Sequence, residues 1–144
     1  MALRFLCVMA VLLSALFAVG KTPPDTMTGV FDERVKSLQV RLDGDNFAAP
    51  VVVLGTPDRI VINFDILAED RDYLRYSLTH CNAFWQPSGL VDSEFLDGFN
   101  EGTIDDYRFS RGTTVHYVNY TLSIPNEQVR PTISGNYLLK VYNE

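Results

Sequence analysis

Apolar and polar residues alternate with a period of two in several short stretches of this chain. The clearest stretch covers residues 59–66, where apolar positions are separated by single intervening residues: Ile60, Ile62, Phe64 and Ile66 against Val61, Asn63 and Asp65. Successive side chains of a strand point to opposite faces of a sheet, so this pattern predicts a half-buried strand. The same pattern, or a short apolar run between turn residues, predicts strands at 35–42, 51–54, 73–81, 116–124 and 136–142.

These strands favour an all-β fold with a single domain. No stretch sustains a helical apolar period over three turns. Six or seven short strands separated by turns, in about 110 residues, are typical of an immunoglobulin-like antiparallel β-sandwich. We therefore predict such a sandwich over residues 35–144, with 21–34 as a flexible lead-in that opens on Lys-Thr-Pro-Pro-Asp.

A segment of different composition, Asn82 to Thr114, interrupts the strand pattern. It is rich in aromatic, glycine and acidic residues. Disordered segments lack bulky groups that can offset the entropy lost on ordering, so we expect this one to fold over the sandwich. The interpretation is a long aromatic and acidic connection between strands, which carries a short strand near 106–110.

The first twenty residues match a secretory signal peptide. Arg4 precedes an apolar run from Phe5 to Val19, which is short for a spanning helix. Small residues before the expected cut predict cleavage between Gly20 and Lys21, with an uncleaved anchor as the alternative. A lipoprotein would carry a cysteine directly after the cut, where this chain has Lys21, so we expect no lipid anchor.

Charge and cysteine content narrow the classes of function. The formal net charge is −6, and without a basic cluster the chain lacks the electrostatic footprint of a nucleic-acid-binding protein. Removal of the signal peptide also removes Cys7, so the mature chain would keep one cysteine, Cys81, and no intrachain disulfide could form. We predict that Cys81 is a small buried hydrophobe, with a reactive thiol as the alternative.

The sequence carries no strong pattern for catalysis or for a cofactor. The acidic residues of the connection do not have the spacing of a calcium loop, and His80 lacks a partner at metal spacing. Cys81, His116 and an aspartate would formally make a nucleophilic triad, but neither a nucleophile elbow nor a glycine-rich phosphate loop accompanies them. We therefore expect a protein that is not an enzyme and binds no cofactor or metal.

Two longer stretches of the sequence form an extended motif. The first runs from His80 through Cys-Asn-Ala-Phe-Trp-Gln-Pro-Ser and continues with Glu-Phe-Leu-Asp-Gly-Phe and Ile-Asp-Asp-Tyr, and the second covers residues 124–142. Together they resemble a known family, the N-terminal domain of the type IX secretion system plug protein. The resemblance implies a periplasmic protein, associated with the outer membrane, that docks on the outer-membrane β-barrel translocon and seals its pore. Family members are longer than this chain, so the match is to their first domain.

We expect the residues that contact such a partner to lie in the connection from Asn82 to Thr114. Aromatic residues dominate interface energies when they fill partner pockets. The candidate contacts are Asp92, Glu94, Phe95, Phe99 and Glu101. Phe95 and Phe99 have an alternative role, which is to pin the connection onto the sandwich. For Trp85 we favour the core over the interface, because such sandwiches commonly bury a tryptophan.

Two other functions are compatible with the sequence. A carbohydrate-binding module of the envelope would need two or three exposed, coplanar aromatic faces among polar groups. A passive scaffold domain of a longer envelope protein would need neither a site nor a partner.

Overall fold

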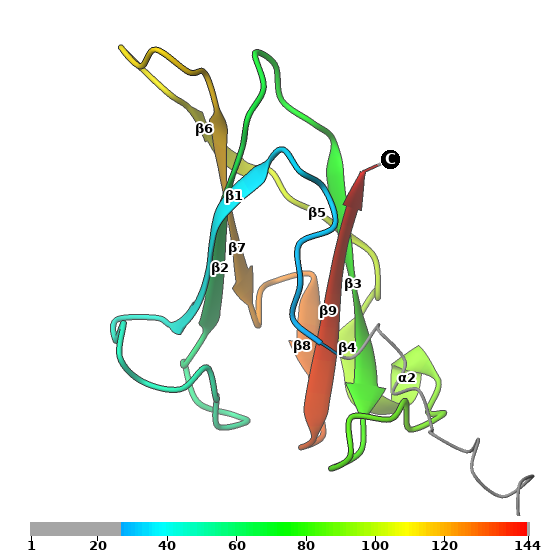
Figure 1. The fold of residues 1–144 in the computed structure, drawn as a ribbon. Coiled ribbons are helices and arrows are strands. Elements are labelled where there is room, and N and C mark those ends of the chain that lie inside the picture. The colour runs from blue at the N-terminus through cyan, green and yellow to red at the C-terminus, as the bar shows by residue number, and fades with distance from the viewer. Residues whose placement is uncertain (1–26, 144) are drawn as a thin grey trace, which may run out of the picture.

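The computed structural model describes residues 27–143 and shows strands in two facing layers (Figure 1). One layer is a four-stranded sheet in the order β1-β2-β7-β6, and the other is a three-stranded sheet in the order β5-β3-β9. A separate pair, β4 with β8, lies near the lower end of β3. The bounds are β1 Val35–Leu42, β2 Ile60–Ile66, β3 Leu74–Cys81, α2 Asp92–Phe95, β4 Leu96–Gly98, β5 Gly102–Thr103, β6 Asp106–Phe109, β7 Val118–Ile124, β8 Val129–Pro131 and β9 Asn136–Asn143.

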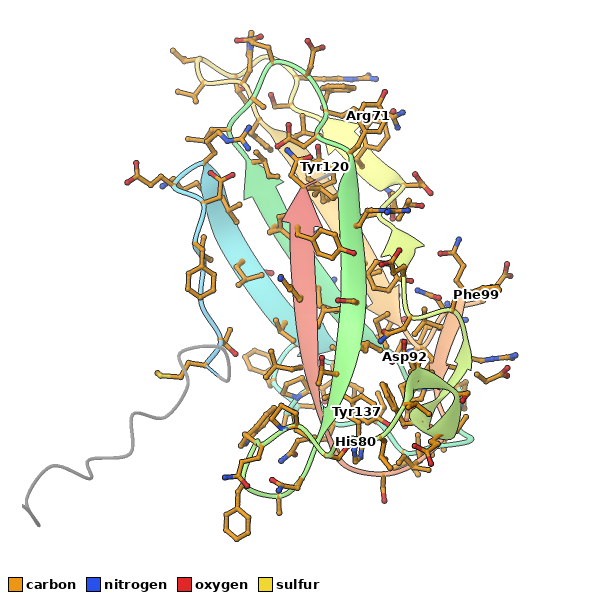
Figure 2. The ribbon with its side chains drawn as sticks, turned by 90° about the vertical axis from the view of Figure 1, so that its right-hand side faces the viewer. Arg71, His80, Asp92, Phe99, Tyr120 and Tyr137 are labelled. Atoms are coloured by element: carbon orange, nitrogen blue, oxygen red, sulfur yellow. The ribbon has the colours of Figure 1, made fainter. Side chains whose placement is uncertain are left out.

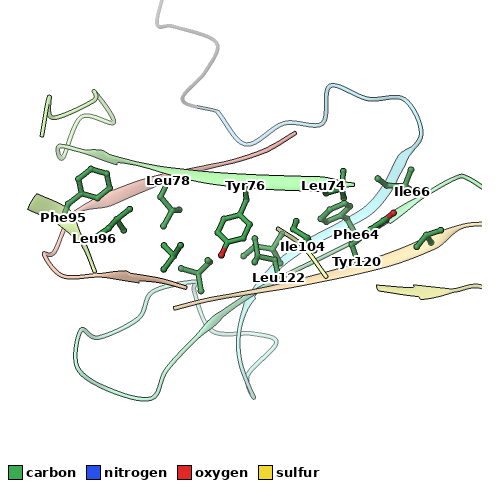
Figure 3. Close-up of a cluster of buried hydrophobic side chains, with 14 residues drawn as sticks. Phe64, Ile66, Leu74, Tyr76, Leu78, Phe95, Leu96, Ile104, Tyr120 and Leu122 are labelled. Atoms are coloured by element: carbon green, nitrogen blue, oxygen red, sulfur yellow. The ribbon is translucent and has the colours of Figure 1, made fainter. Parts of the chain in front are cut away.

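The apolar residues that alternate along β2, β3 and β7 form the hydrophobic core, as the sequence predicts. In β2 and β7 all seven residues pair in register, from Ile60 opposite Ile124 to Ile66 opposite Val118. One face of this pair meets one face of β3, and the side chains between the two sheets form a single hydrophobic cluster (Figure 3). Tyr76 and Tyr120 belong to this cluster, with 1% and 0% of their surface exposed. Burial of this cluster is the main favourable term in folding.

The predicted antiparallel β-sandwich is confirmed. The order β1-β2-β7-β6 corresponds to the ABED sheet of an immunoglobulin constant domain, and β3 beside β9 corresponds to the C and F strands of the second sheet. All strand pairs in the described residues are antiparallel: β1 with β2, β2 with β7, β6 with β7, β3 with β5, β3 with β9, and β4 with β8.

The strand predicted at 51–54 is wrong. Val51 and Val53 lie in the loop between β1 and β2, with 70% and 63% of their surface exposed. Pro50 has no backbone N–H to donate, and the N–H of Thr56 donates to the carbonyl of Val53 at 3.2 Å in a local turn. An apolar run alone does not make a strand, because a strand also needs a neighbour to pair with.

The chain before β1 is only partly described. The signal peptide and its cleavage site at Gly20 and Lys21 lie outside the described residues, and residues 27–34 contain no strand. The guanidinium of Arg34 binds Asp32 at 2.8 Å and Asp72 at 2.9 Å. The hydrogen bonds from Arg34 lower the pKa of the Asp32 carboxyl. These contacts join the end of this segment to the loop that precedes β3.

The end of β3 buries Cys81 and His80, as the sequence predicts. Cys81 is a free thiol with none of its surface exposed, and burial raises its pKa. The His80 ring lies 2.8 Å from the Ser88 hydroxyl through Nδ1 and 3.3 Å from the Ser134 carbonyl through Nε2. Both nitrogens therefore have structural partners, and the buried thiol is screened from reagents.

Candidate functional site

The connection from Asn82 to Thr114 is folded onto the sandwich. Its three short strands pair with three different strands of the fold, β4 with β8, β5 with β3 and β6 with β7. Three of its apolar residues enter the core: Phe95, Leu96 and Ile104, with 2%, 5% and 5% of their surface exposed. The expectation of an ordered segment is therefore correct, and its exposed side chains stand on a fixed backbone.

Phe95 lies inside the protein. Its ring centroid is 5.9 Å from that of His80 and 6.1 Å from that of Tyr137. Both of these neighbours lie at the lower end of the sandwich (Figure 2). The carbonyl of Phe95 accepts a hydrogen bond from the N–H of Thr132 at 2.9 Å. Phe95 thus pins the connection to the fold, and we remove it from the surface that can contact a partner.

Phe99 has the opposite orientation. With 84% of its surface exposed, it projects from the body of the protein (Figure 2). Its N–H donates to the carbonyl of Gln128 at 3.3 Å. The preceding residue, Gly98, has φ +111° and lies so close to the Gln128 carbonyl that a Cβ would collide with it. Glycine at this position lets the backbone pass directly against Gln128, the residue before β8, while the Phe99 ring stays exposed.

The three candidate acids are exposed, and each already has a partner within the protein. Asp92 accepts a hydrogen bond from Asn100 at 2.8 Å, and Glu94 accepts one from the Val91 N–H at 2.9 Å. Glu101 lies 3.7 Å from Arg75. Asp92 and Glu94 therefore support the local structure of the connection, while all three residues remain exposed.

The core position favoured for Trp85 is wrong. Trp85 is 45% exposed and has φ +59°, a left-handed conformation that is unusual for a residue with a side chain. It lies beyond the end of β3 in a turn where the Asn82 side chain accepts from the N–H groups of Phe84 and Gln86, at 2.9 and 3.1 Å. Tyr76, in the middle of β3, is the large aromatic residue that fills the core instead.

This turn displays a second exposed ring beside Trp85. Phe84 has 83% of its surface exposed. The Asn82 carbonyl also accepts a hydrogen bond from the Asn136 side chain at 3.0 Å, which ties the turn to the start of β9. A backbone that the protein itself holds in place loses little entropy when its side chains bind a partner.

The formal triad of Cys81, His116 and an aspartate is not assembled. Cys81 is buried with its thiol 3.8 Å from the carbonyl of Thr79, and His116 pairs with Glu69 at 2.6 Å through Nδ1. Within residues 27–143, no group of three or more histidine, cysteine or carboxylate side chains is placed to hold a metal ion. In the same range, no helix has the length and hydrophobicity needed to cross a bilayer.

The outer face of the four-stranded sheet has a shallow hollow of about 510 Å³, lined in part by Asp65, Arg108, Phe109 and Tyr117. A sugar site would stack its ligand on coplanar aromatic faces. The aromatic residues that line the hollow are Phe109 and Tyr117. The Phe109 ring meets Tyr107, which packs against the core, edge to face at 89°, so these two rings do not form a coplanar stacking surface.

Comparison with known proteins places the chain in a family. The model of the type 9 secretion system plug protein 1st domain matches residues 35–144. The chain belongs to this family. The match confirms the resemblance seen in the sequence, and the family is not a family of enzymes.

A solved structure supports the same fold. A hypothetical protein from Parabacteroides merdae ATCC 43184 superimposes with a TM-score of 0.76 and 42% sequence identity. The alignment covers 78% of this plug-family chain and 28% of the solved chain, so this chain spans less than a third of that protein's length. The comparison with curated proteins found no match.

Proposed function

We propose that this protein is a non-enzymatic interaction domain that docks on the outer-membrane β-barrel translocon of type IX secretion and takes part in closing its pore. Membership of the plug family supports an association with a secretion translocon. The contact would be made by the docking surface, which we define as the exposed residues of the connection: Phe84, Trp85, Asp92, Glu94, Phe99 and Glu101.

The observation that carries this proposal is the exposure of large aromatic rings on a fixed backbone. Phe84 and Phe99 expose 83% and 84% of their surface. Their N–H groups are nevertheless hydrogen-bonded, that of Phe84 to Asn82 in the same turn and that of Phe99 to Gln128. Exposed aromatic residues of this kind are the usual anchors of protein interfaces, because burial in a partner pocket removes a large apolar area from water. A plug also needs a rigid body, which the sandwich provides.

Export to the periplasm follows from the same proposal. The plug family suggests an envelope or periplasmic location, and the apolar run that ends before Lys21 would direct export. We expect the mature protein to begin at Lys21. Sequencing of its N-terminus would show this residue first, and a protein that retains Met1 in the membrane fraction would contradict the expectation.

Substitution of Phe99 tests the docking surface. We expect Phe99→Ser to reduce co-purification of the translocon barrel by about 10- to 30-fold, the effect of losing an interface anchor worth about 2 kcal/mol. Tyr73→Ser is the matched control, since Tyr73 is 62% exposed and stacks with Arg71, which lies at the upper end of the sandwich, away from Phe99 (Figure 2). Equal yields of barrel with both variants would count against the proposal.

A further inference from the structure

The loop between β1 and β2 carries an uninterrupted apolar run that stays outside the core. The run is Phe-Ala-Ala-Pro-Val-Val-Val-Leu, from Phe47 to Leu54. None of the residues 43–59 is buried, and Phe47 is exposed over its whole surface. A contiguous apolar surface that a fold leaves in water marks a site of contact with a partner protein or with a membrane.

This loop lies at the lower end of the sandwich. β1 runs down into it, whereas β9 ends at the upper end, close to the C-terminus (Figure 1). A segment that continued from β9 would therefore leave the domain at the end away from the loop. The helix α2 of the connection also lies at the lower end, on the other side from the loop (Figure 1). The loop and the connection can thus face the same target layer together.

The composition of the run distinguishes a lipid from a protein as its partner. Protein interfaces combine apolar area with hydrogen bonds and charged residues, as the docking surface does with its rings and carboxylates. Between Phe47 and Leu54 no side chain can form a hydrogen bond or an ion pair. The hydrocarbon of a bilayer offers no hydrogen-bond partners, so a run of this kind suits that environment.

The backbone of the loop satisfies several of its own polar groups. The Asp45 carboxylate accepts from the N–H groups of Phe47 and Ala48, at 2.9 and 3.1 Å. The N–H of Val51 donates to the Ala49 carbonyl at 2.7 Å, and Pro50 has no N–H. Backbone groups that already have partners lower the cost of leaving water, which is the main obstacle to placing a loop among lipids.

We propose that the apolar run from Phe47 to Leu54 inserts into the surface of a lipid bilayer, at the boundary between the headgroups and the acyl chains. Burial of its side chains there removes their apolar area from water, which is the driving force of interfacial binding. The inference rests on the proposed function, which brings the domain to the outer membrane. The connection would contact the barrel, and the loop would contact the lipid beside it.

The charge of the loop defines the kind of bilayer. The segment from Asp43 to Asp58 contains no lysine or arginine and has a third carboxylate at Asp45. Attraction to anionic headgroups therefore cannot contribute to binding. We expect the protein to bind vesicles of zwitterionic phosphatidylcholine, to bind no better when anionic phosphatidylglycerol is added, and to keep its affinity at high salt.

A pair of matched valine variants tests the proposal in residues 21–144. In vesicle co-sedimentation, Val53→Asp should weaken binding to phosphatidylcholine by about tenfold, because a carboxylate is costly to take out of water. Val115→Asp is the control and should bind as the unaltered protein does. The two valines are 63% and 60% exposed, and Val115 lies in the hairpin loop between β6 and β7 at the upper end (Figure 1).

Tryptophan emission reports insertion directly. Trp85 is the one tryptophan of the chain, so the double variant Trp85→Phe with Phe47→Trp moves the reporter into the loop. Its emission should shift to shorter wavelength when vesicles are added, as an indole does on leaving water.

Three results would each overturn the proposal: no binding of the unaltered protein to the vesicles, equal binding of Val53→Asp and Val115→Asp, or an emission that vesicles leave unchanged. Phe99→Ser should bind vesicles normally while it loses the barrel. Failure of the docking surface and failure of the loop are therefore seen in different variants. Loss of the barrel through Val53→Asp, in a protein that does not bind vesicles, would show that the loop contacts protein and would also overturn the proposal.

Discussion

Replacement of Tyr120 by alanine is expected to remove about 4–5 kcal/mol of folding stability, close to the whole stability of a domain that totals about 5–15 kcal/mol. Tyr120 has none of its surface exposed, and its ring stacks on Phe64 with centroids 5.6 Å apart. Its hydroxyl accepts a hydrogen bond from the Asp72 N–H at 2.7 Å. Burial also raises the pKa of this phenol, which keeps it neutral in the fold.

Urea unfolding measures this effect. Tyr120→Phe should cost about 1–2 kcal/mol, because it removes the hydroxyl and leaves the Asp72 N–H without that acceptor while the ring remains. Tyr73→Ala, at an exposed position, should change stability by less than about 0.5 kcal/mol. If Tyr120→Ala unfolded at the same urea concentration as Tyr73→Ala, the assignment of Tyr120 to the core would be incorrect.

Phe95→Ala is expected to cost about 3–5 kcal/mol of folding stability, because it opens a cavity between α2 and the end of the sandwich. The lost contacts are those with the rings of His80 and Tyr137. Phe99→Ala should cost less than about 0.5 kcal/mol, since the ring is in solvent. The two phenylalanines lie four residues apart in the same connection, yet their replacement should have very different effects on folding stability.

Thermal unfolding of both variants, monitored by circular dichroism, separates the two roles. The expected result is a large loss of melting temperature for Phe95→Ala and an unchanged value for Phe99→Ala. A conservative Phe95→Leu variant should recover part of the loss, because it refills part of the cavity. Equal melting temperatures for the two alanine variants would mean that the connection is not anchored by Phe95.

The elements that the sequence predicts correctly are those with a strand neighbour on one or both sides and one face in the core. In β2, β3 and β7 the alternation of apolar residues follows directly from this environment. The run at 51–54 is just as apolar, but in the structure it lies in a loop and pairs with no neighbouring strand. Strands β4, β5 and β8 have two or three residues, so they are too short for a period of two to appear in the sequence.

The orientation of the aromatic residues in the connection was harder to predict. Phe95 and Phe99 have the same type and similar neighbours in sequence, and the difference between them arises from the pairing of β4 with β8. Trp85 is turned outward by the side chain of Asn82, which holds a turn with a left-handed residue. The pairing of β4 with β8 joins distant segments, which local patterns do not encode.

Site-specific crosslinking gives the most direct test of the central claim, that the docking surface contacts the translocon. A photoreactive amino acid would replace Phe99 in one variant and Tyr73 in another, in the protein produced in its own cells. We predict a crosslink from position 99 to the outer-membrane barrel and none from position 73. Crosslinking of the barrel from position 73 but not from position 99 would contradict the account.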